Sequence, residues 1–328
     1  MSNALVFADD GTPGITRKRI RNSWGYFAPD GSRITDRDEI DRLNKIALPP
    51  AYIDCWYATD PDAHLLAFGF DARGRKQYRY HPGWTEERAA RKFDLCPAFG
   101  LALPKLRKRI EADLAGRTLG RERAIASVVA LLDTGAIRVG NEAYARTNKS
   151  FGATTLRNRH AKIEGRVLRL RFKGKSGKLH EIDCTDAKLV RCVRRMQDLP
   201  GQNLFQYLDD SGDPVPVSSG DVNGYIHETM GDQFTARNFR TWTASAIAFG
   251  LVCANPQIGL KPLLEQVAER LGNTPAIARK SYVHPAVLAA VQGDAGYTAL
   301  LPGRLPRATK WLSGDERGLI GFLDALSC

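Results

Sequence analysis

Apolar residues recur three and four positions apart through most of the chain beyond residue 95, which is the spacing of helices with one buried face. Stop and start signals agree with this period: Gly135 follows one such segment, and Thr274 with Pro275 opens another. The segments expected to be helical are 103–114, 121–132, 187–196, 221–230, 235–249, 260–271, 275–283 and 314–327. The pattern therefore predicts a larger, mainly α-helical domain.

Strand-like segments interrupt this helical pattern once. Segments 159–164, 166–172 and 179–184 follow one another closely, with a tight turn at Glu164-Gly165 and a second turn at 173–178. They predict a three-stranded antiparallel sheet within the helical domain.

The N-terminal part shows both the helical spacing and the strand-like alternation of apolar residues. It holds one expected helix at 38–46 and expected strands at 52–57 and 64–70. The predicted fold class is α+β, a small mixed α/β-sheet domain followed by the mainly helical one. The predicted divisions are a flexible arm at 1–20, the small domain at 21–85, a charged linker at 86–94, and the large domain at 95–328.

Composition narrows the possible partners. The 328 residues are 43% hydrophobic and 26% charged, with a net charge of +12 and a pI of about 9.5. The basic residues lie in separate clusters with aromatic residues between them, which favours nucleic acid over a membrane surface. A basic, solvated surface without a specific partner is the alternative.

Cysteine use and targeting signals point to the cytoplasm. The six cysteines include no C-x-x-C pair and no histidine at ligand spacing, so we expect reduced thiols and neither a metal site nor disulfides. There is no signal peptide, and no apolar run approaches the roughly 18 residues of a membrane span.

One basic cluster lies on a predicted hairpin at 71–81. Alternation along a strand places Arg79 on one face and both Tyr78 and Tyr80 on the other. Such a hairpin could hold phosphates while its tyrosines contact sugars or bases, although an edge strand protected by cations gives the same pattern. The candidate DNA contacts here are Arg73, Arg75, Lys76, Gln77, Tyr78, Arg79 and Tyr80.

A second cluster surrounds the turn Gly174-Lys175-Ser176. A phosphate-binding loop of the nucleotide type is excluded because Arg169 stands where that motif requires glycine and a strand follows in place of a helix. Two interpretations of Lys175 remain, a functional lysine at a mobile hairpin tip and a solvated basic turn.

Three further basic groups lie far apart in the sequence. Arg138 follows a helix end in a segment bracketed by glycines, where backbone can approach a ligand. Arg237 and Arg240 are three residues apart at the start of a helix, hence on one face, with Trp242 free to pack beneath. Arg157 and His160 precede the first strand of the three-stranded sheet. Each arginine could form an ordinary ion pair, and His160 could be a structural residue bonded to backbone.

Tyr282 leaves the last turn of the helix that Thr274 and Pro275 begin, next to Lys280 and close to His284. Taken alone, a half-buried tyrosine with its hydroxyl in water is the usual case. The basic neighbours make this tyrosine a candidate functional residue.

From about residue 25 to the C-terminus, these features together resemble the type IB DNA topoisomerases, in particular the small poxvirus-like enzymes of bacteria. The pieces that carry the resemblance are Leu-Pro-Pro-Ala-Tyr at 48–52, the basic hairpin 71–82, Ile-Arg-Val-Gly-Asn-Glu at 137–142, Thr-Thr-Leu-Arg-Asn-Arg-His at 154–160, Gly-Lys-Ser at 174–176, Phe-Arg-Thr-Trp at 239–242, and Lys-Ser-Tyr at 280–282.

The resemblance implies a role for each matching residue. Tyr282 would be the nucleophile, Arg138 and Arg240 the phosphate-clamping arginines, and Lys175 the general acid. Asn273 stands nine positions before Tyr282, where the family commonly has histidine and bacterial relatives use asparagine. Arg237 takes a place where relatives often have lysine, which leaves its role less defined.

The implied activity is relaxation of supercoiled double-stranded DNA by transient cleavage of one strand through a 3′-phosphotyrosyl intermediate, followed by religation. The resemblance implies neither metal nor ATP nor another cofactor. It also implies that the small domain clamps the DNA, that the chain works as a monomer, and that it is cytoplasmic and associated with the nucleoid.

Two other functions remain open from the sequence. Tyrosine site-specific recombinases use a similar set of Arg, Lys, Arg and Tyr, but usually have histidine three residues before the second arginine and a helical N-terminal domain. A non-catalytic DNA-binding protein would explain the charge but not the joint occurrence of Arg138, Lys175, Arg240 and Tyr282.

Overall fold

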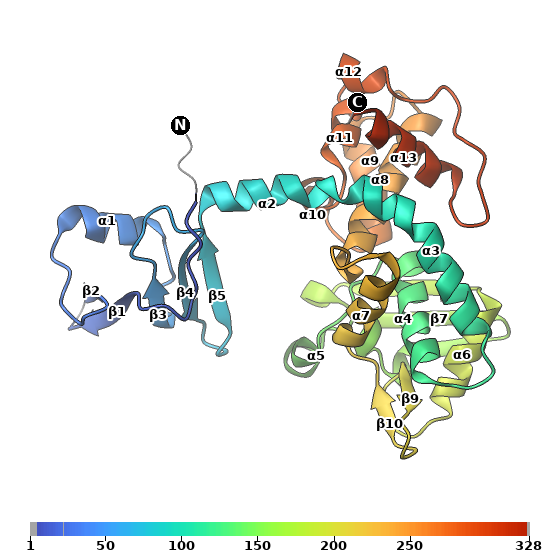
Figure 1. The fold of residues 1–328 in the computed structure, drawn as a ribbon, viewed down its shortest axis with the longest axis horizontal. Helices are drawn as coiled ribbons and strands as arrows, with labels where there is room; N and C mark the ends of the chain where they lie inside the picture. Colours follow the sequence, from blue (N-terminus) through green and yellow to red (C-terminus); the bar gives the residue numbers. More distant parts are fainter. Residues whose placement is uncertain (1–4, 22, 327–328) are drawn as a thin grey trace. The chain divides into compact units, whose positions relative to one another are not determined.

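The structure, a computed structural model, describes residues 5–21 and 23–326. The chain forms two compact units, Met1–Lys92 and Phe93–Cys328, each of which is described here on its own (Figure 1). Both units contain helices and antiparallel sheets, which confirms the predicted α+β class.

The N-terminal unit is built on a five-stranded antiparallel sheet with the order β2-β1-β3-β4-β5. Its elements are β1 (Ile15–Ile20), β2 (Ser23–Phe27), α1 (Arg37–Lys45), β3 (Ile53–Tyr57), β4 (Leu65–Phe70) and β5 (Lys76–Tyr80). Asp36 caps α1 by accepting from the N–H of Asp38, and Leu43 packs in a core with Tyr57 and Ala67. The predicted helix and two strands of this part are confirmed.

The flexible arm predicted for 1–20 is wrong for its last six residues, which form β1. The sequence of β1 carries three cations in a row and lacks an apolar alternation, so its period did not indicate a strand. In the structure the cations are accommodated by the sheet: Arg17 donates to the carbonyls of Leu48 and Pro49, and its guanidinium carbon lies 4.7 Å from the ring centroid of Trp24.

The segment predicted as a linker, 86–94, lies inside helix α2 (Pro82–Asp94). The helix begins at a proline, whose missing N–H costs nothing in the first turn. The helix-forming residues that indicated a linker therefore continue a regular helix across the boundary between the two units.

The C-terminal unit is mainly helical and packs around α8 (Ala236–Ala254), which contacts α3, α4, α9, α11 and α13. Phe239, Trp242 and Phe249 of α8 are fully buried in its core. The neighbouring long helices are α3 (Cys96–Ala115), α4 (Arg121–Gly135), α6 (Ala187–Gln197), α7 (Ser219–Met230), α9 (Leu260–Leu271) and α13 (Gly314–Ala325). Each overlaps a predicted helix; residue 327 of the last prediction lies outside the described residues.

The predicted three-stranded sheet is confirmed as β6 (Ala161–Glu164), β7 (Val167–Lys173) and β8 (Leu179–Cys184), in the order β6-β7-β8. Leu168, Leu170 and Phe172 of β7 are buried, while the alternate residues are exposed. This alternation seats one face of the sheet on the helices of the unit.

Several short elements were not predicted, because segments of three to seven residues carry too few positions to show a period. They are α5 (Glu142–Asn148), α11 (Pro285–Val291), α12 (Ala295–Thr298) and the small antiparallel pair β9 (Gln206–Leu208) and β10 (Pro214–Pro216). Among the described residues, no helix is both long and apolar enough to cross a bilayer.

Candidate active site

Tyr282 lies where α10 (Pro275–Ser281) ends. Thr274 caps the start of this helix, and the chain leaves helical geometry at Tyr282, whose φ is −134°. The tyrosine is partly buried, and its ring centroid lies 4.9 Å from the guanidinium carbon of Arg240. The predicted nucleophile and one predicted phosphate-clamping arginine are therefore neighbours.

Arg240 is 3% exposed and is held by backbone from two other helices. Its Nη1 donates to the carbonyl of Ala136, at the end of α4, and its Nη2 donates to the carbonyl of Leu271, at the end of α9, at 3.0 Å. Burial and the nearby Arg138 lower the pKa of Arg240. Ala136 and Leu271 lie two residues before Arg138 and Asn273. The Arg240 side chain therefore holds the segments of these two residues close together.

Arg138 and Asn273 are joined directly: Nη2 of Arg138 donates to Oδ1 of Asn273 at 3.0 Å. Asn273 is 7% exposed, and its Nδ2 has no hydrogen-bond partner among the described residues. Nε of Arg240 is likewise buried without a partner in the described part of the chain. Buried donors in this state are uncommon in folded proteins, and a water, an ion or a bound ligand can supply the acceptor.

The backbone around Arg138 packs closely against the backbone around Gly152, and the glycines of both segments allow this approach. Ala136 caps α4 in the left-handed region, and Gly140 has a φ of +103°. A Cβ on Gly152 would lie 2.6 Å from the carbonyl oxygen of Arg138, so glycine is required there. This packing fixes the segment from which Arg138 extends.

Within the described residues, neither Arg138 nor Arg240 forms an ion pair with a carboxylate. Their partners are carbonyl oxygens, the amide oxygen of Asn273 and the ring of Tyr282. No carboxylate in the described part of the chain therefore neutralises the charge of either guanidinium group. Two cations and one amide donor beside a phenol form a site suited to a phosphate group.

Lys175 is not part of this cluster. It lies in the short 3₁₀ turn Lys175–Gly177 between β7 and β8, is exposed, and makes no hydrogen bond or ion pair with any described residue. Lys178, from the same turn, does reach the site, because its Nζ donates to the carbonyl of Asn273 at 2.8 Å.

Two residues that border the site were not found from the sequence. His180 of β8 is close enough to Arg240 and Arg138 for both to depress its pKa to about 4, after the larger effect of burial. Ser245 of α8 is fully buried; its Oγ lies 3.2 Å from the carbonyl oxygen of Tyr282 and accepts from the N–H of His284 at 3.0 Å. His180 follows Lys175 by five positions, and this closeness was the available signal.

The predicted contacts on the N-terminal hairpin are largely accessible. Arg79, Tyr78 and Tyr80 are exposed, and the two tyrosine rings stack with centroids 5.9 Å apart on one face, as their alternation predicted. Two cations of the hairpin have acidic partners: Arg75 pairs with Asp71, and Lys76 pairs with Asp10. Arg73 is exposed and Gln77 is half-buried.

Arg157 and His160, two other predicted DNA contacts, form hydrogen bonds within the protein. Arg157 donates to Glu142 at 2.6 Å and to the side chain of Asn203. Nδ1 of His160 accepts from the backbone N–H of Arg157, and burial, with Arg159 and Arg157, lowers its pKa to about 4. The structure thus shows the backbone bond that was the alternative interpretation of His160.

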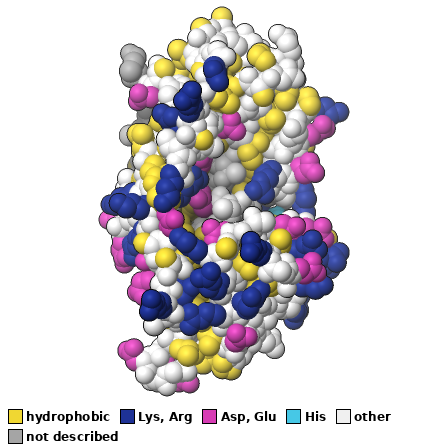
Figure 2. All heavy atoms as spheres, turned by 90° about the vertical axis from the view of Figure 1, so that its right-hand side faces the viewer, with side chains coloured by type: hydrophobic (Ala, Val, Ile, Leu, Met, Phe, Trp, Pro, Cys, Tyr) yellow, Lys and Arg dark blue, Asp and Glu magenta, His cyan; other side chains and the backbone are white. Residues whose placement is uncertain are grey.

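Arg237 and Arg240 do not share an environment, although they are three residues apart on α8. Arg237 is exposed, whereas Arg240 is buried. Figure 2 shows many further Lys and Arg side chains spread over one face of the molecule, with Asp and Glu among them. Positive charge is therefore not confined to the candidate site.

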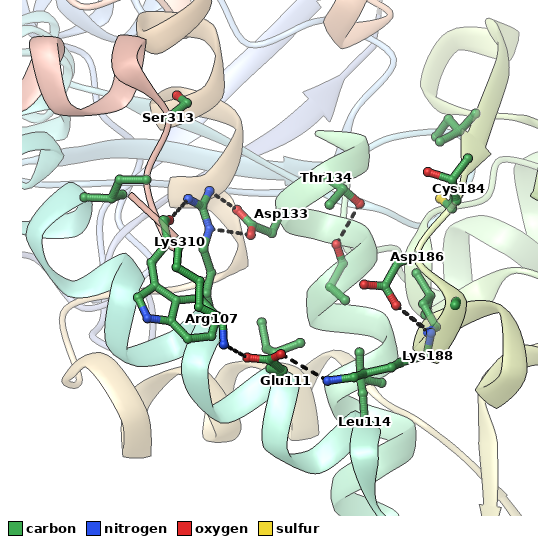
Figure 3. Close-up of a pocket in the computed structure, with 18 of the residues that line it drawn as sticks. Arg107, Glu111, Leu114, Asp133, Thr134, Cys184, Asp186, Lys188, Lys310 and Ser313 are labelled. Atoms are coloured by element: carbon green, nitrogen blue, oxygen red, sulfur yellow. Dashed lines mark hydrogen bonds and ion pairs between the residues drawn. The ribbon is translucent and has the colours of Figure 1, made fainter. Parts of the chain in front are cut away.

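A cavity of about 1110 Å³ lies elsewhere in the C-terminal unit, between α3, α4, β8 and residues 309–316 (Figure 3). Six of its charged groups pair with one another: Arg107 binds Asp133 and Glu316, while Glu111 bridges Lys188 and Lys310. It includes none of the five predicted catalytic residues.

Comparison with known proteins gives the family of this chain. The family model described as the catalytic core of eukaryotic DNA topoisomerase I matches residues 81–292, and that of the bacterial DNA topoisomerase IB N-terminal domain matches residues 23–71. DNA topoisomerase 1B of Acanthamoeba polyphaga mimivirus is 32% identical over 285 residues, covering 82% of this chain and 85% of the viral protein. The chain belongs to the type IB DNA topoisomerases.

More distant members of the topoisomerase family are also similar. DNA topoisomerase 1B of vaccinia virus (strain Copenhagen) is 22% identical, with 70% of this chain and 73% of the viral protein covered. The solved XerH site-specific recombinase bound to palindromic difH is 16% identical, with a TM-score of 0.34; the match covers 56% of this chain and about half (47%) of the recombinase. The family model and the mimivirus relative give the enzyme class, which is DNA topoisomerase, an isomerase.

Proposed function

We propose that this topoisomerase relaxes supercoiled double-stranded DNA with Tyr282 as the nucleophile and with Arg138, Arg240 and Asn273 as the phosphate site. The observation that carries the proposal is the group of largely unexposed N–H donors beside Tyr282: no carboxylate among the described residues neutralises the two guanidinium groups, and Nδ2 of Asn273 has no partner there. A DNA phosphodiester supplies the acceptors that these groups require.

In the cleavage step, Tyr282 loses its phenolic proton to solvent water, and the phenolic oxygen attacks phosphorus. A P–O bond to the tyrosine forms as the P–O5′ bond breaks, which leaves a 3′-phosphotyrosine and a free 5′-hydroxyl. Charge increases on the non-bridging oxygens and on O5′ as the reaction proceeds. Arg138 and Arg240 donate to the non-bridging oxygens, and by analogy with one oxyanion-hole donor each such interaction is worth about 3–4 kcal/mol in the transition state.

The leaving O5′ needs a proton, and Lys175 is the proposed donor. Its exposed position at the end of the β7–β8 hairpin requires that this hairpin move onto the DNA when the substrate binds. Rejoining is the reverse reaction: the 5′-hydroxyl attacks the phosphotyrosine and returns its proton to Lys175. The covalent intermediate conserves the energy of the broken bond, so the cycle consumes no ATP.

Plasmid relaxation in EDTA without ATP tests this proposal. We expect the wild-type protein to relax supercoiled plasmid, and Tyr282→Phe, which keeps the ring beside Arg240, to be inactive. Covalent protein–DNA adduct trapped on a nicked duplex should map to Tyr282. Relaxation by the Tyr282→Phe protein at the wild-type rate would show that another residue is the nucleophile.

The N-terminal unit is proposed to act as a DNA clamp that contacts phosphates through the exposed cations near β5. Binding should then weaken steeply with salt, because each neutralised phosphate releases counterions and contributes about −0.9 to the slope of log K against log salt. Arg79→Ala should reduce that slope by about 1. An unchanged slope in Arg79→Ala would place the clamp elsewhere.

One chain contains all five proposed catalytic residues. We therefore propose that the enzyme works as a monomer, on DNA in the cytoplasm. Light scattering of the complex with a short duplex should give one protein chain per duplex.

A further inference from the structure

His180 is a titratable residue beside the site for which the mechanism above has no use. It stands on β8 directly across from Phe172 of β7, and the two rings stack with centroids 5.2 Å apart and planes inclined by 8°. Phe172 is buried in the core of the unit. The imidazole is therefore held in a defined place at the base of the hairpin that carries Lys175.

The edge of the imidazole fits between two glycines. A Cβ on Gly174 would lie 2.6 Å from both Cδ2 and Nε2 of His180, and a Cβ on Gly272 would lie 2.3 Å from Cε1. Gly174 has a φ of −91°, which any residue adopts, so its lack of a side chain is explained by the ring and not by its backbone. Gly272 caps α9 in the left-handed region and so has a second reason to be glycine.

These two glycines belong to the two parts of the site that must act together. Gly174 precedes Lys175, and Gly272 precedes Asn273. A second link joins the same parts, because Nζ of Lys178 donates to the carbonyl of Asn273 at 2.8 Å. His180 thus fills the space between the general-acid hairpin and the buried phosphate site.

The imidazole is neutral at physiological pH. Burial, then Arg240, Arg138 and Lys178, hold its pKa at about 4. A neutral ring packs against the hairpin without adding a fourth positive charge, which would repel these three cations.

We propose that His180 is a positioning residue that sets the Lys175 hairpin against the Asn273 turn, so that the lysine reaches the leaving oxygen when DNA binds. This inference rests on the proposed function, since it assigns His180 a role through Lys175. General-acid catalysis depends on placement within hydrogen-bonding reach, so a hairpin that loses its packing loses proton donation first.

The test compares two DNA substrates in single-turnover cleavage. One has an ordinary phosphodiester, and the other has sulfur in place of the 5′-bridging oxygen. A thiolate leaves without a proton, so the second substrate does not need Lys175. We expect His180→Ala to cleave the ordinary substrate about 10–100-fold more slowly and the sulfur substrate within threefold of the wild type. Lys175→Ala should show the same contrast.

The outcomes separate the inference from the proposed function. Equal losses on both substrates, or no loss on either, would overturn the positioning role of His180. A wild-type protein that cleaves neither substrate would instead contradict the proposed function. Circular dichroism and Tm of His180→Ala identify a folding defect, and the contrast between substrates is one that a general folding defect does not produce.

A double-mutant cycle tests the fit of the ring directly. Gly174→Ala places a methyl group against His180 and should slow cleavage of the ordinary substrate. In Gly174→Ala/His180→Ala the ring is gone, so the double variant should be no slower than His180→Ala alone. Additive losses would show that Gly174 is not there to accommodate the imidazole.

Discussion

Nη2 of Arg138 donates to Oδ1 of Asn273 at 3.0 Å, although the two residues are 135 positions apart in the chain. This bond sets the orientation of the amide, because the oxygen is used by Arg138 and Nδ2 is left as a buried donor. In the proposed phosphate site, the bond to Arg138 therefore leaves the amide nitrogen of Asn273 to donate to the substrate.

Asn273→Asp should lower the single-turnover cleavage rate by about 10²–10³-fold, the typical loss for one oxyanion donor. The change is nearly isosteric, but it removes the N–H donor and places a negative charge next to the phosphate and Arg138. Asn273→His, which restores a ring N–H donor, should retain more activity than Asn273→Asp. Equal rates for Asn273→Asp and wild type would remove Asn273 from the site.

Arg240→Lys should lower both the cleavage rate and Tm. A lysine ammonium lacks the fork that lets Arg240 bind the carbonyls of Ala136 and Leu271 together, so the ends of α4 and α9 lose a shared partner. Arg237→Lys is the matched control for stability, since Arg237 is exposed on the same helix and its replacement should leave Tm unchanged. Thermal unfolding of both variants provides the comparison. Similar Tm values would mean that the backbone bonds of Arg240 do not hold these helix ends.

Glu316 joins three helices of the C-terminal unit. It accepts from Arg107 of α3 at 2.7 Å and from Nε1 of Trp242 of α8 at 3.0 Å, and it lies in the first turn of α13. Glu316→Ala should destabilise the unit by about 3–5 kcal/mol, as expected when one partner of a largely buried ion pair is removed.

Glu111→Ala is the control for this prediction because Glu111 lines the same cavity but is more exposed (Figure 3). Its loss should destabilise the unit much less, because exposed ion pairs contribute little to stability. Urea unfolding of the two variants measures the difference. Equal destabilisation would contradict the view that the Glu316 contacts act as a buried network.

Lowering the pH from about 6.5 toward 4 should destabilise the protein in part through His284. Burial lowers the pKa of His284 to about 4, against a weaker opposing effect of Asp94, while in the unfolded chain the ordinary value of about 6.5 applies. The unfolded state therefore takes up the proton first as pH falls, and stability is lost across this window.

The variant that tests this is His284→Asn. His284 caps α11 by accepting the N–H of Ala286, and asparagine can accept that bond as well. The urea midpoint of the variant should fall less between pH 7 and pH 5 than that of the wild type. Parallel curves would show that His284 does not titrate on unfolding.

Much of the local structure followed from the sequence because its causes are local. The apolar period marked α8 and its neighbours, Thr274 and Pro275 marked the start of α10, and alternation placed Tyr78 and Tyr80 on one face of β5. The same local motifs carried the family resemblance. They also fixed the identity of the residues that the structure brings together, from Arg138 to Tyr282.

What the sequence did not reveal depends on partners from distant segments. The helical spacing predicted that Arg237 and Arg240 share one face of α8. In the structure only Arg240 is buried, because it packs against the ends of α4 and α9. Likewise, Arg157 is tied to Glu142, and β1 is a strand because the sheet and its aromatic rings accommodate its cations.

The sequence by itself determined the longer helices, the three-stranded sheet, the family and the candidate catalytic side chains, because caps, periods and motifs act over a few residues. The tertiary structure alone decided that Asn273 presents its amide nitrogen and that His180 fills the gap between two glycines, because both depend on contacts between segments far apart in the chain. Such contacts form only when the whole unit packs, and the spacing of apolar residues along the sequence does not specify them.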